Sequence, residues 1–292
     1  MNASGALCVT REELEALGRS QAGAIVTKSM TLEARAGNPL PRYYPFVGGS
    51  LNSMGLPNLG YQVYAELIPA LKSFGKPVIA SVAGLCEDDF PTIARTISHA
   101  GPDLIEVNLS CPNIPGKPQI GYDFEASERL IRRVRAAVDR PMGVKLPPYF
   151  DPAHHAAMAD VLKRAPVDFL SLINSVGNAL VLDPERESVV IKPKGGFGGL
   201  GGAVIKPVAL ANVRAFWKAF EGQVPIIGVG GVMSGADAFE HLLAGASAVQ
   251  IGTALVEEGT GVFNRIAGEL QALLTKKGYP SAAAVVGRLK EL

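Results

Sequence analysis

The stretch VIASVAGLCEDDFPTIARTISHAGPDLIEVNL (residues 78–109) contains two short apolar runs, 78–82 and 104–109, with an amphipathic segment over 87–100 between them. Short apolar runs rich in β-branched residues are typical of buried strands, and the longer segment between them is typical of a helix. Two buried strands joined by a helix form a βαβ unit, in which the strands are parallel and the helix covers one face of the sheet. Residues 78–109 therefore predict a parallel α/β fold.

The same alternation of short and long segments extends across the chain. Eight strands are predicted, at the very N-terminus and at residues 23–27, 78–82, 104–109, 142–146, 169–173, 225–229 and 248–251. Eight helices are predicted at residues 12–20, 61–73, 87–100, 124–138, 152–164, 207–220, 235–244 and 261–276. Because eight such units close on themselves, we expect a (β/α)8 TIM barrel. No linker or shift in composition divides the chain, so residues 1–292 are expected to form a single domain.

The composition excludes several classes of protein. Charged residues make up 19% of the chain and hydrophobic residues 48%, and 28 Lys and Arg against 27 Asp and Glu leave a net charge of +1. This balance argues against a disordered chain and against a protein that coats nucleic acid or an acidic membrane surface. Three cysteines without a CxxC pair argue against a disulfide framework and a structural zinc site. Because the start has no basic, apolar leader and no uncharged apolar run reaches about 18 residues, we expect a cytoplasmic protein.

Polar residues or glycines follow almost every predicted strand. In a barrel of parallel strands, the active site is built at the carboxyl ends of the strands. The residues at these ends are, in chain order, Ser4, Lys28, Ser81, Asn108 with Cys111, Lys145, Asn174 with Ser175, 228–231 (GVGG) and 251–254 (IGTA). Several polar ends that converge on one barrel mouth indicate a binding or catalytic site.

The last two strand ends predict a phosphate site. Loops after the seventh and eighth strands of such barrels present backbone N–H groups to a phosphate. The GVGG stretch at 228–231 and the pair Gly252 and Thr253 occupy these positions. We therefore expect a ligand that carries a phosphate group.

Two long loops are expected to be functional elements, at residues 29–60 and 175–206. The second contains a glycine cluster with a GxGxxG pattern over 196–201. No clear strand leads directly into this pattern, and the next predicted helix begins only at residue 207. The dinucleotide-binding interpretation is therefore disfavoured, and we expect a flexible loop near the ligand.

Cys111 is the best candidate for an acid–base group or nucleophile. It follows the fourth predicted strand in the string NLSCPN, and Pro112 disfavours a helix at this point. Cys8 and Cys86 are expected to be small buried side chains.

The histidines at 99, 154, 155 and 241 fall inside predicted helices and are expected to be surface or packing residues. The arginines at 129, 132, 133 and 135 share one helix and predict a solvated outer face.

Long strings in the sequence carry a family resemblance. In order, they are NASG (2–5), TKSMTLEARAGNPLPR (27–42), LNSMGLPN (51–58), NLSCPNIPGKPQ (108–119), GVKLPPYFD (143–151), NSVGN (174–178), IKPKGGFGGLGG (191–202) and IGTAL (251–255). Together they resemble the class 1A dihydroorotate dehydrogenases, soluble FMN enzymes that use fumarate. The cysteine of NLSCPN is typical of class 1, since the membrane-associated class 2 enzymes carry a serine base. NSMGLPN and KLPPYFD are typical of class 1A, whereas class 1B needs a partner subunit with FAD and an iron–sulfur cluster.

The resemblance implies a reaction in de novo pyrimidine (UMP) biosynthesis. Cys111 would take a proton from C5 of dihydroorotate while a hydride leaves C6 for FMN, and fumarate would then be reduced in the same site. A thiol needs a thiolate population for this role, so nearby cations or hydrogen-bond donors are expected. The resemblance also implies a cytoplasmic homodimer without a metal, without an FAD and iron–sulfur partner, and without nucleic acid or membrane partners.

The resemblance also assigns binding residues. Those expected to hold dihydroorotate are Lys28, Asn52, Met54, Gly55, Leu56, Asn108, Asn174 and Ser175. Asparagines suit a ring with alternating N–H and C=O groups, because an amide both donates and accepts. Those expected to hold FMN are Ala3, Ser4, Gly5, Lys28, Ser29, Asn108, Lys145, Ile173, Gly202, Gly230, Gly231, Gly252 and Thr253. Within this set, Lys145 would compensate charge on the reduced ring, and the last four would bind the phosphate.

Two alternatives stay open at this point. Family members carry further residues before NASG. Either translation starts upstream of Met1, or the first strand is shortened, in which case we expect lower stability and weaker FMN retention. A non-catalytic flavin-binding chain, impaired by this start, is one alternative. The other is a different FMN barrel reductase, which would act on pyrimidines with NADPH and partner cofactor domains, or on tRNA dihydrouridine with an RNA-binding domain and a basic surface.

Overall fold

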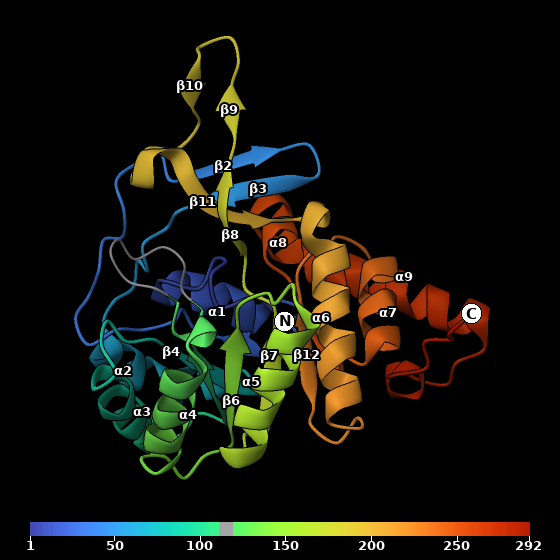
Figure 1. The fold of residues 1–292 in the computed structure, drawn as a ribbon, viewed down its shortest axis with the longest axis horizontal. Coiled ribbons are helices and arrows are strands. Elements are labelled where there is room, and N and C mark those ends of the chain that lie inside the picture. The colour runs from blue at the N-terminus through green and yellow to red at the C-terminus, as the bar shows by residue number, and fades with distance from the viewer. Residues whose placement is uncertain (111–118) are drawn as a thin grey trace.

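A curled sheet of seven parallel strands forms the centre of the structure, a computed structural model that describes residues 1–110 and 119–292 (Figure 1). The strands lie side by side in the order β1-β4-β5-β6-β7-β12-β13. Their bounds are Ile25–Val26, Val78–Val82, Leu104–Asn108, Met142–Leu146, Phe169–Leu172, Ile226–Val229 and Ala248–Gln250. Every neighbouring pair is parallel. The predicted TIM-barrel-like α/β fold is therefore confirmed, and each of these strands lies within two residues of its predicted position.

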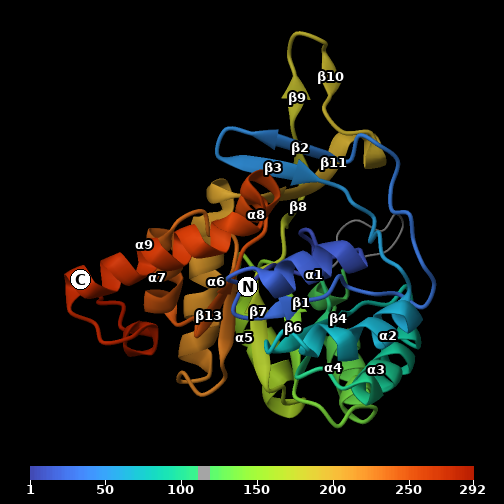
Figure 2. The ribbon, with the colours of Figure 1, turned by 180° about the vertical axis from the view of Figure 1, so that it is seen from behind.

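Helices surround the sheet and connect its strands (Figure 2). They are α1 to α9, with bounds Arg11–Arg19, Tyr61–Lys72, Asp89–Ala100, Phe124–Arg135, Pro152–Arg164, Lys206–Ala219, Gly235–Ala244, Thr253–Glu258 and Val262–Lys277. Local sequence explains several of their starts. The α1 helix begins with a capping box in which Thr10 and Glu13 bind each other's backbone N–H groups, and the Ser234 side chain caps α7. The short helix α8 was not predicted.

Helix α4 shows why these segments form amphipathic helices. Leu130, Ile131 and Val134 are buried on one side of the helix, with Val134 about one turn after Leu130 and Ile131. The arginines 129, 132, 133 and 135 lie on the opposite side and form ion pairs with Glu87, Asp88, Glu128 and Asp168. The predicted solvated arginine face is confirmed.

Residues 1–3 close the barrel between β13 and β1. Ile251 N donates to Met1 O at 2.9 Å and Ala3 N donates to Ile251 O at 2.9 Å, which makes a single parallel bridge at Asn2. On the other side, the Asn2 side chain forms the hydrogen bonds to β1 that the backbone of a neighbouring strand would otherwise form. Val26 N donates to Asn2 Oδ1 at 2.9 Å, and Asn2 Nδ2 donates to Val26 O at 2.7 Å. Residues 1–3 thus pair with β13 through the backbone and with β1 through the Asn2 side chain.

A second, antiparallel sheet is formed from the two long segments that were predicted as loops. Its order is β2-β3-β11-β8, with bounds Tyr43–Phe46, Gly49–Asn52, Phe197–Gly201 and Val176–Leu180. Figures 1 and 2 show it across one end of the barrel, with the hairpin of β9 (Leu182–Asp183) and β10 (Ser188–Val189) projecting beyond. Short 3-10 helices cover Ile120–Tyr122, Pro193–Gly196, Ala203–Ile205, Gly259–Gly261 and Ala282–Val285.

The prediction of a flexible glycine loop was wrong, because β11 is a strand at the middle of this sheet. Its glycines allow close packing. A Cβ at Gly198 would lie 2.6 Å from Asn52 O, and one at Gly199 would lie 2.2 Å from Ser175 Oγ. These glycines let neighbouring segments pack close to the backbone of β11, whereas the sequence pattern suggested a flexible backbone.

The cysteine and histidine predictions have mixed outcomes. Cys8 is buried as predicted, but Cys86 is exposed. The prediction failed for Cys86 because it lies in the loop before α3, where Asp89 binds the backbone N–H of residue 86 and the thiol. The histidines at 99 and 154 are exposed, 155 is half-buried, and 241 packs in the core, as expected. In the described part of the chain, no helix is long and apolar enough to cross a membrane.

Candidate active site

A cavity of about 430 Å³ lies between the carboxyl ends of the parallel strands and the antiparallel sheet. Strand ends supply residues such as Asn108, Lys145 and Ile173, and the antiparallel sheet supplies Asn52. The predicted residues that line it are Ala3, Ser4, Gly5, Lys28, Ser29, Asn52, Met54, Leu56, Asn108, Lys145, Ile173, Asn174, Ser175, Gly202, Gly230, Gly231, Gly252 and Thr253. The structure thus brings residues from positions 3 to 253 to one place. This agrees with the rule that a barrel of parallel strands builds its site at the carboxyl ends of the strands, called the strand-end rule below.

Two predicted site residues are not on this lining. Gly55 packs instead against Asn38, where an added Cβ would lie 2.4 Å from Asn38 Oδ1. Its φ of 72° also favours glycine. Cys111 lies outside the described residues. Its neighbour in the chain, Ser110, is buried and accepts a hydrogen bond from Asn174 Nδ2 on its carbonyl at 2.8 Å.

Further lining residues were missed from the sequence. They are Ala6, Leu7, Val9, Glu13, Tyr43, Ser50, Gly201, Ile205, Val229, Val232, Met233, Gln250 and Val256. Tyr43 and Ser50 belong to the unpredicted antiparallel sheet, so no local signal marked them. Gln250 is the last residue of β13, and the strand-end rule could have found it had the search included the final strand residue as well as the following one.

Asparagines from separate elements hold fixed orientations at the cavity. Asn108 Nδ2 donates to Ser29 Oγ at 3.1 Å, while Asn108 Oδ1 accepts from the Ser110 N–H at 3.1 Å. Asn174 Nδ2 donates to Ser110 Oγ at 2.9 Å, and Asn52 Nδ2 donates to Gly199 O at 3.0 Å. Because these contacts distinguish the oxygen from the nitrogen of each amide, the asparagines can present a defined pattern of donors and acceptors.

Two buried lysines give the cavity a positive character. Lys28 and Lys145 are each only 4% exposed. Lys145 Nζ donates to Ser4 Oγ at 3.3 Å and to Gln250 Oε1 at 3.4 Å, both long hydrogen bonds to neutral groups. Glu13 supplies a carboxylate to the lining, where it accepts from the N–H groups of Val9 at 2.6 Å and Thr10 at 3.2 Å, the second of which belongs to the capping box of α1. The arrangement favours an anionic or electron-rich ligand.

The glycines after β12 and β13 suit close approach of a ligand to the backbone. Gly230 and Gly231 have φ of 120° and 73°, which disfavour other residues. A Cβ at Gly252 would meet only Ala3 Cβ, at 3.8 Å, and one at Gly5 would meet only Lys28 Nζ, at 3.8 Å. These two positions therefore keep the cavity wall open, and the glycine backbones could hold a phosphate.

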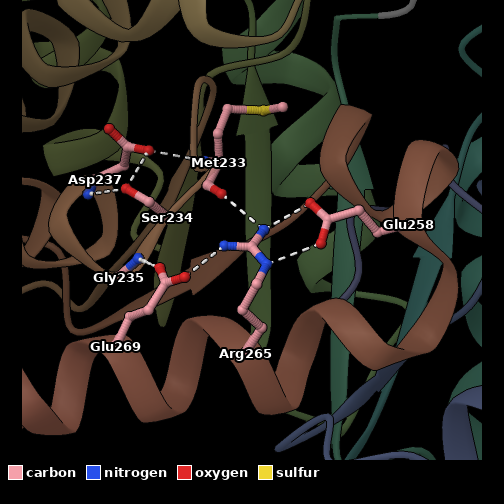
Figure 3. A network of polar contacts seen from close by, with 7 residues as sticks. All are labelled: Met233, Ser234, Gly235, Asp237, Glu258, Arg265 and Glu269. Atoms are coloured by element: carbon pink, nitrogen blue, oxygen red, sulfur yellow. Dashed lines mark hydrogen bonds and ion pairs between the residues drawn. The ribbon is translucent and has the colours of Figure 1, made fainter.

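A polar network fixes the loop after β12 against helices α8 and α9 (Figure 3). Arg265 Nη2 donates to Met233 O at 2.9 Å and to Glu258 at 2.6 Å, and Nη1 donates to Glu269 at 2.8 Å. Glu269 also accepts from the Gly235 N–H at 2.7 Å. This hydrogen bond, followed by those from Arg265, lowers the pKa of Glu269. Since Met233 lines the cavity and Glu258 ends α8, Arg265 ties the loop after β12 to the last residue of α8.

The residues 1–110 and 119–292 contain no cluster of three His, Cys, Asp or Glu side chains placed to hold a metal ion. The cavity lining includes two lysines, one glutamate and one tyrosine, set among amides and hydroxyls. This donor set suits recognition of a polar organic ligand through hydrogen bonds.

Comparison with known proteins places this arrangement in context. A family model described as "Dihydroorotate dehydrogenase" matches residues 1–274. The chain is 52% identical over 296 residues to dihydroorotate dehydrogenase A (fumarate) of Lactococcus lactis subsp. lactis (strain IL1403), covering 100% of this chain and 95% of that protein. It is 49% identical over 296 residues to dihydroorotate dehydrogenase (fumarate) of Kluyveromyces lactis, covering 100% and 94%. A crystal structure of DHODH from Eimeria tenella in complex with ferulenol matches with a TM-score of 0.83 at 21% identity, covering 98% of this chain and 84% of that chain. At that identity, the structural match supports the fold alone.

Proposed function

The chain belongs to the dihydroorotate dehydrogenase family, and we propose that it oxidises dihydroorotate to orotate with fumarate as the final electron acceptor, a step of pyrimidine biosynthesis. One observation carries this proposal: the asparagines and buried lysines expected from the resemblance line a single cavity. The extensive identity to relatives named for fumarate favours class 1A. It also disfavours the alternative of a pyrimidine or tRNA dihydrouridine reductase.

We propose FMN as the cofactor of this cavity. When bound, FMN would accept a hydride from the substrate and return the electrons to fumarate. The open wall beside Gly5 and Gly252 fits a flat ring, and the glycine backbones at 230–231 fit a phosphate. Lys145 is buried and makes two long hydrogen bonds to neutral groups, and it would stabilise negative charge on the reduced ring.

Substrate recognition would come from the amides and from Lys28. Dihydroorotate is a small ring with N–H and C=O groups and a carboxylate. Asn52, Asn108 and Asn174 hold amides of fixed orientation toward one cavity, which matches donors and acceptors on such a ring. Lys28 supplies a buried positive charge for the anionic substrate.

The base in this proposal is Cys111. This role is supported by the NLSCPN string and by the position of Ser110, directly before it, beside Asn174. A thiolate at position 111 would take the proton from C5, next to a carbonyl, while the lysines favour the anionic form. Fumarate is also a carboxylate, so the same cation and amides could hold it in turn.

We further propose that the protein acts in the cytoplasm as a homodimer, without an FAD and iron–sulfur partner subunit. Class 1A membership supports this proposal. Size-exclusion chromatography with light scattering measures the oligomeric state of the purified protein directly.

The decisive experiment is anaerobic titration of the purified, FMN-loaded protein with dihydroorotate. Flavin absorbance should bleach, and fumarate should restore it, whereas NADPH should not reduce the flavin. Bleaching by NADPH alone would support a different flavin reductase. A protein that binds FMN but shows no bleaching with dihydroorotate would be the non-catalytic alternative, and the proposed function would be wrong.

A further inference from the structure

We propose that Glu106, in the interior of the barrel, is a positioning residue for Lys145: it acts through Gln250 and sets how strongly the lysine stabilises reduced flavin. Glu106 is fully buried and does not line the cavity, so it would touch neither substrate nor cofactor. This inference rests on the proposed function of the cavity, with FMN beside Lys145.

Three donors from three other strands surround the Glu106 carboxylate. Ser81 Oγ donates to Oε1 at 3.1 Å, Ser171 Oγ donates to Oε2 at 2.7 Å, and Gln250 Nε2 donates to Oε2 at 3.1 Å. An ionised carboxylate accepts hydrogen bonds and donates none, so this shell is complementary to the charged form. A buried carboxylate with three donors is therefore a fixed negative charge inside the barrel.

The hydrogen bonds of Ser81 and Ser29 are also consistent with an ionised Glu106. The Ser81 hydroxyl has one proton, which goes to Glu106, so in its 2.9 Å contact with Ser29 the donor must be Ser29. Ser29 Oγ is then available to accept from Asn108 Nδ2, at 3.1 Å. Every donor in this chain points toward Glu106, as an ionised carboxylate requires.

The second chain of hydrogen bonds leads to the cofactor lysine. Because Gln250 donates its NH2 group to Glu106, its Oε1 faces Lys145 Nζ, at 3.4 Å. If Gln250 rotated by half a turn, its NH2 group would face the ammonium, and both groups would be donors. Glu106 therefore keeps an acceptor against Lys145 and also supplies the negative charge that partly offsets the lysine.

Replacing Glu106 with glutamine removes this charge and preserves the shape. The new NH2 group must face either Ser81 or the pair of Ser171 and Gln250. Because an NH2 group donates, the partners on that side must accept hydrogen bonds where they donated to Glu106 before. In both cases Lys145 loses its buried counter-charge and stabilises reduced flavin more strongly. The midpoint potential of bound FMN should therefore rise.

The test measures this potential in the FMN-loaded protein by equilibration with a reference dye, without dihydroorotate. For Glu106→Gln, the ratio of reduced to oxidised flavin at a fixed potential should increase at least tenfold, which is about 30 mV for a two-electron couple. The matched control is Ser171→Ala, which removes one donor from the same carboxylate and keeps the charge. Its ratio should stay within threefold of the parent. A structural role for Glu106 would lower the melting temperature and leave the potential unchanged.

A second variant keeps the test decisive if Glu106→Gln does not hold FMN. The double exchange Glu106→Gln with Gln250→Glu keeps the net charge and moves the carboxylate to the side chain that contacts Lys145. The potential should then fall below that of the parent, with the ratio decreased at least tenfold. An unchanged or higher potential in the double variant overturns the inference, as does a Glu106→Gln potential equal to that of the parent. If instead the parent holds FMN but dihydroorotate does not reduce it, the proposed function fails, and the potentials still test the role of Glu106.

Discussion

The closure of the barrel through Asn2 leads to a quantitative prediction for Asn2→Ala. The Asn2 side chain binds both the N–H and the C=O of Val26, at 2.9 and 2.7 Å, and both residues are fully buried. Alanine would leave these two backbone groups without a partner, and each buried unsatisfied group costs about 1–3 kcal/mol. The free energy of unfolding should therefore fall by about 2–6 kcal/mol, a large share of a typical total of about 5–15 kcal/mol.

The measurement is urea unfolding of the FMN-loaded protein, followed by circular dichroism, together with its flavin content. Residues 3–5 line the cavity, so the variant should also retain less flavin. Asn264→Ala is the matched control, since Asn264 is exposed on α9 and its loss should change stability by no more than about 0.5 kcal/mol. If Asn2→Ala loses less than about 1 kcal/mol, the two hydrogen bonds do not contribute as argued.

Three further predictions concern single side chains. Cys111→Ser should keep FMN bound but slow flavin reduction by dihydroorotate at least about 100-fold near neutral pH, because a serine hydroxyl is far less ionised than a thiol at that pH, and the loss should be smaller at high pH. Equal stopped-flow rates at neutral pH would contradict this role. In that variant a thiol reagent should label Cys86 rapidly and Cys8 only after unfolding, since burial raises the pKa of Cys8 to about 12; labelling should disappear from the native protein when Cys86 is also changed to serine. Burial lowers the pKa of His241 below 6.5, so below about pH 6.5 the unfolded chain takes up a proton that the folded chain does not. The free energy of unfolding should therefore decrease as the pH falls below about 6.5, by up to about 1.4 kcal/mol per pH unit. Urea unfolding at several pH values should show a shallower decrease for His241→Gln, and identical pH dependence of the two proteins would refute the argument.

The sequence by itself determined the parallel strands, the helices and most of the cavity lining. Segments such as 78–82 and 142–146 are mostly apolar and buried throughout, and a near-continuous apolar run is typical of strands covered on both faces. The same rule located much of the site, because the carboxyl ends of parallel strands meet at one end of a barrel. Lys145 and Asn108 could therefore be placed together from their positions in the chain alone.

Only the tertiary structure decided the features that depend on contacts between distant segments. The glycines of β11 have the local signature of a loop, and they form a strand because Asn52 and Ser175 pack against them. Nothing near Asn2 in the sequence indicates that its side chain pairs with Val26, and nothing near Glu106 indicates that its partners come from three other strands. Local patterns report which face of an element is apolar. Which polar groups satisfy one another is settled only when the elements pack, because a hydrogen bond depends on the position of both partners.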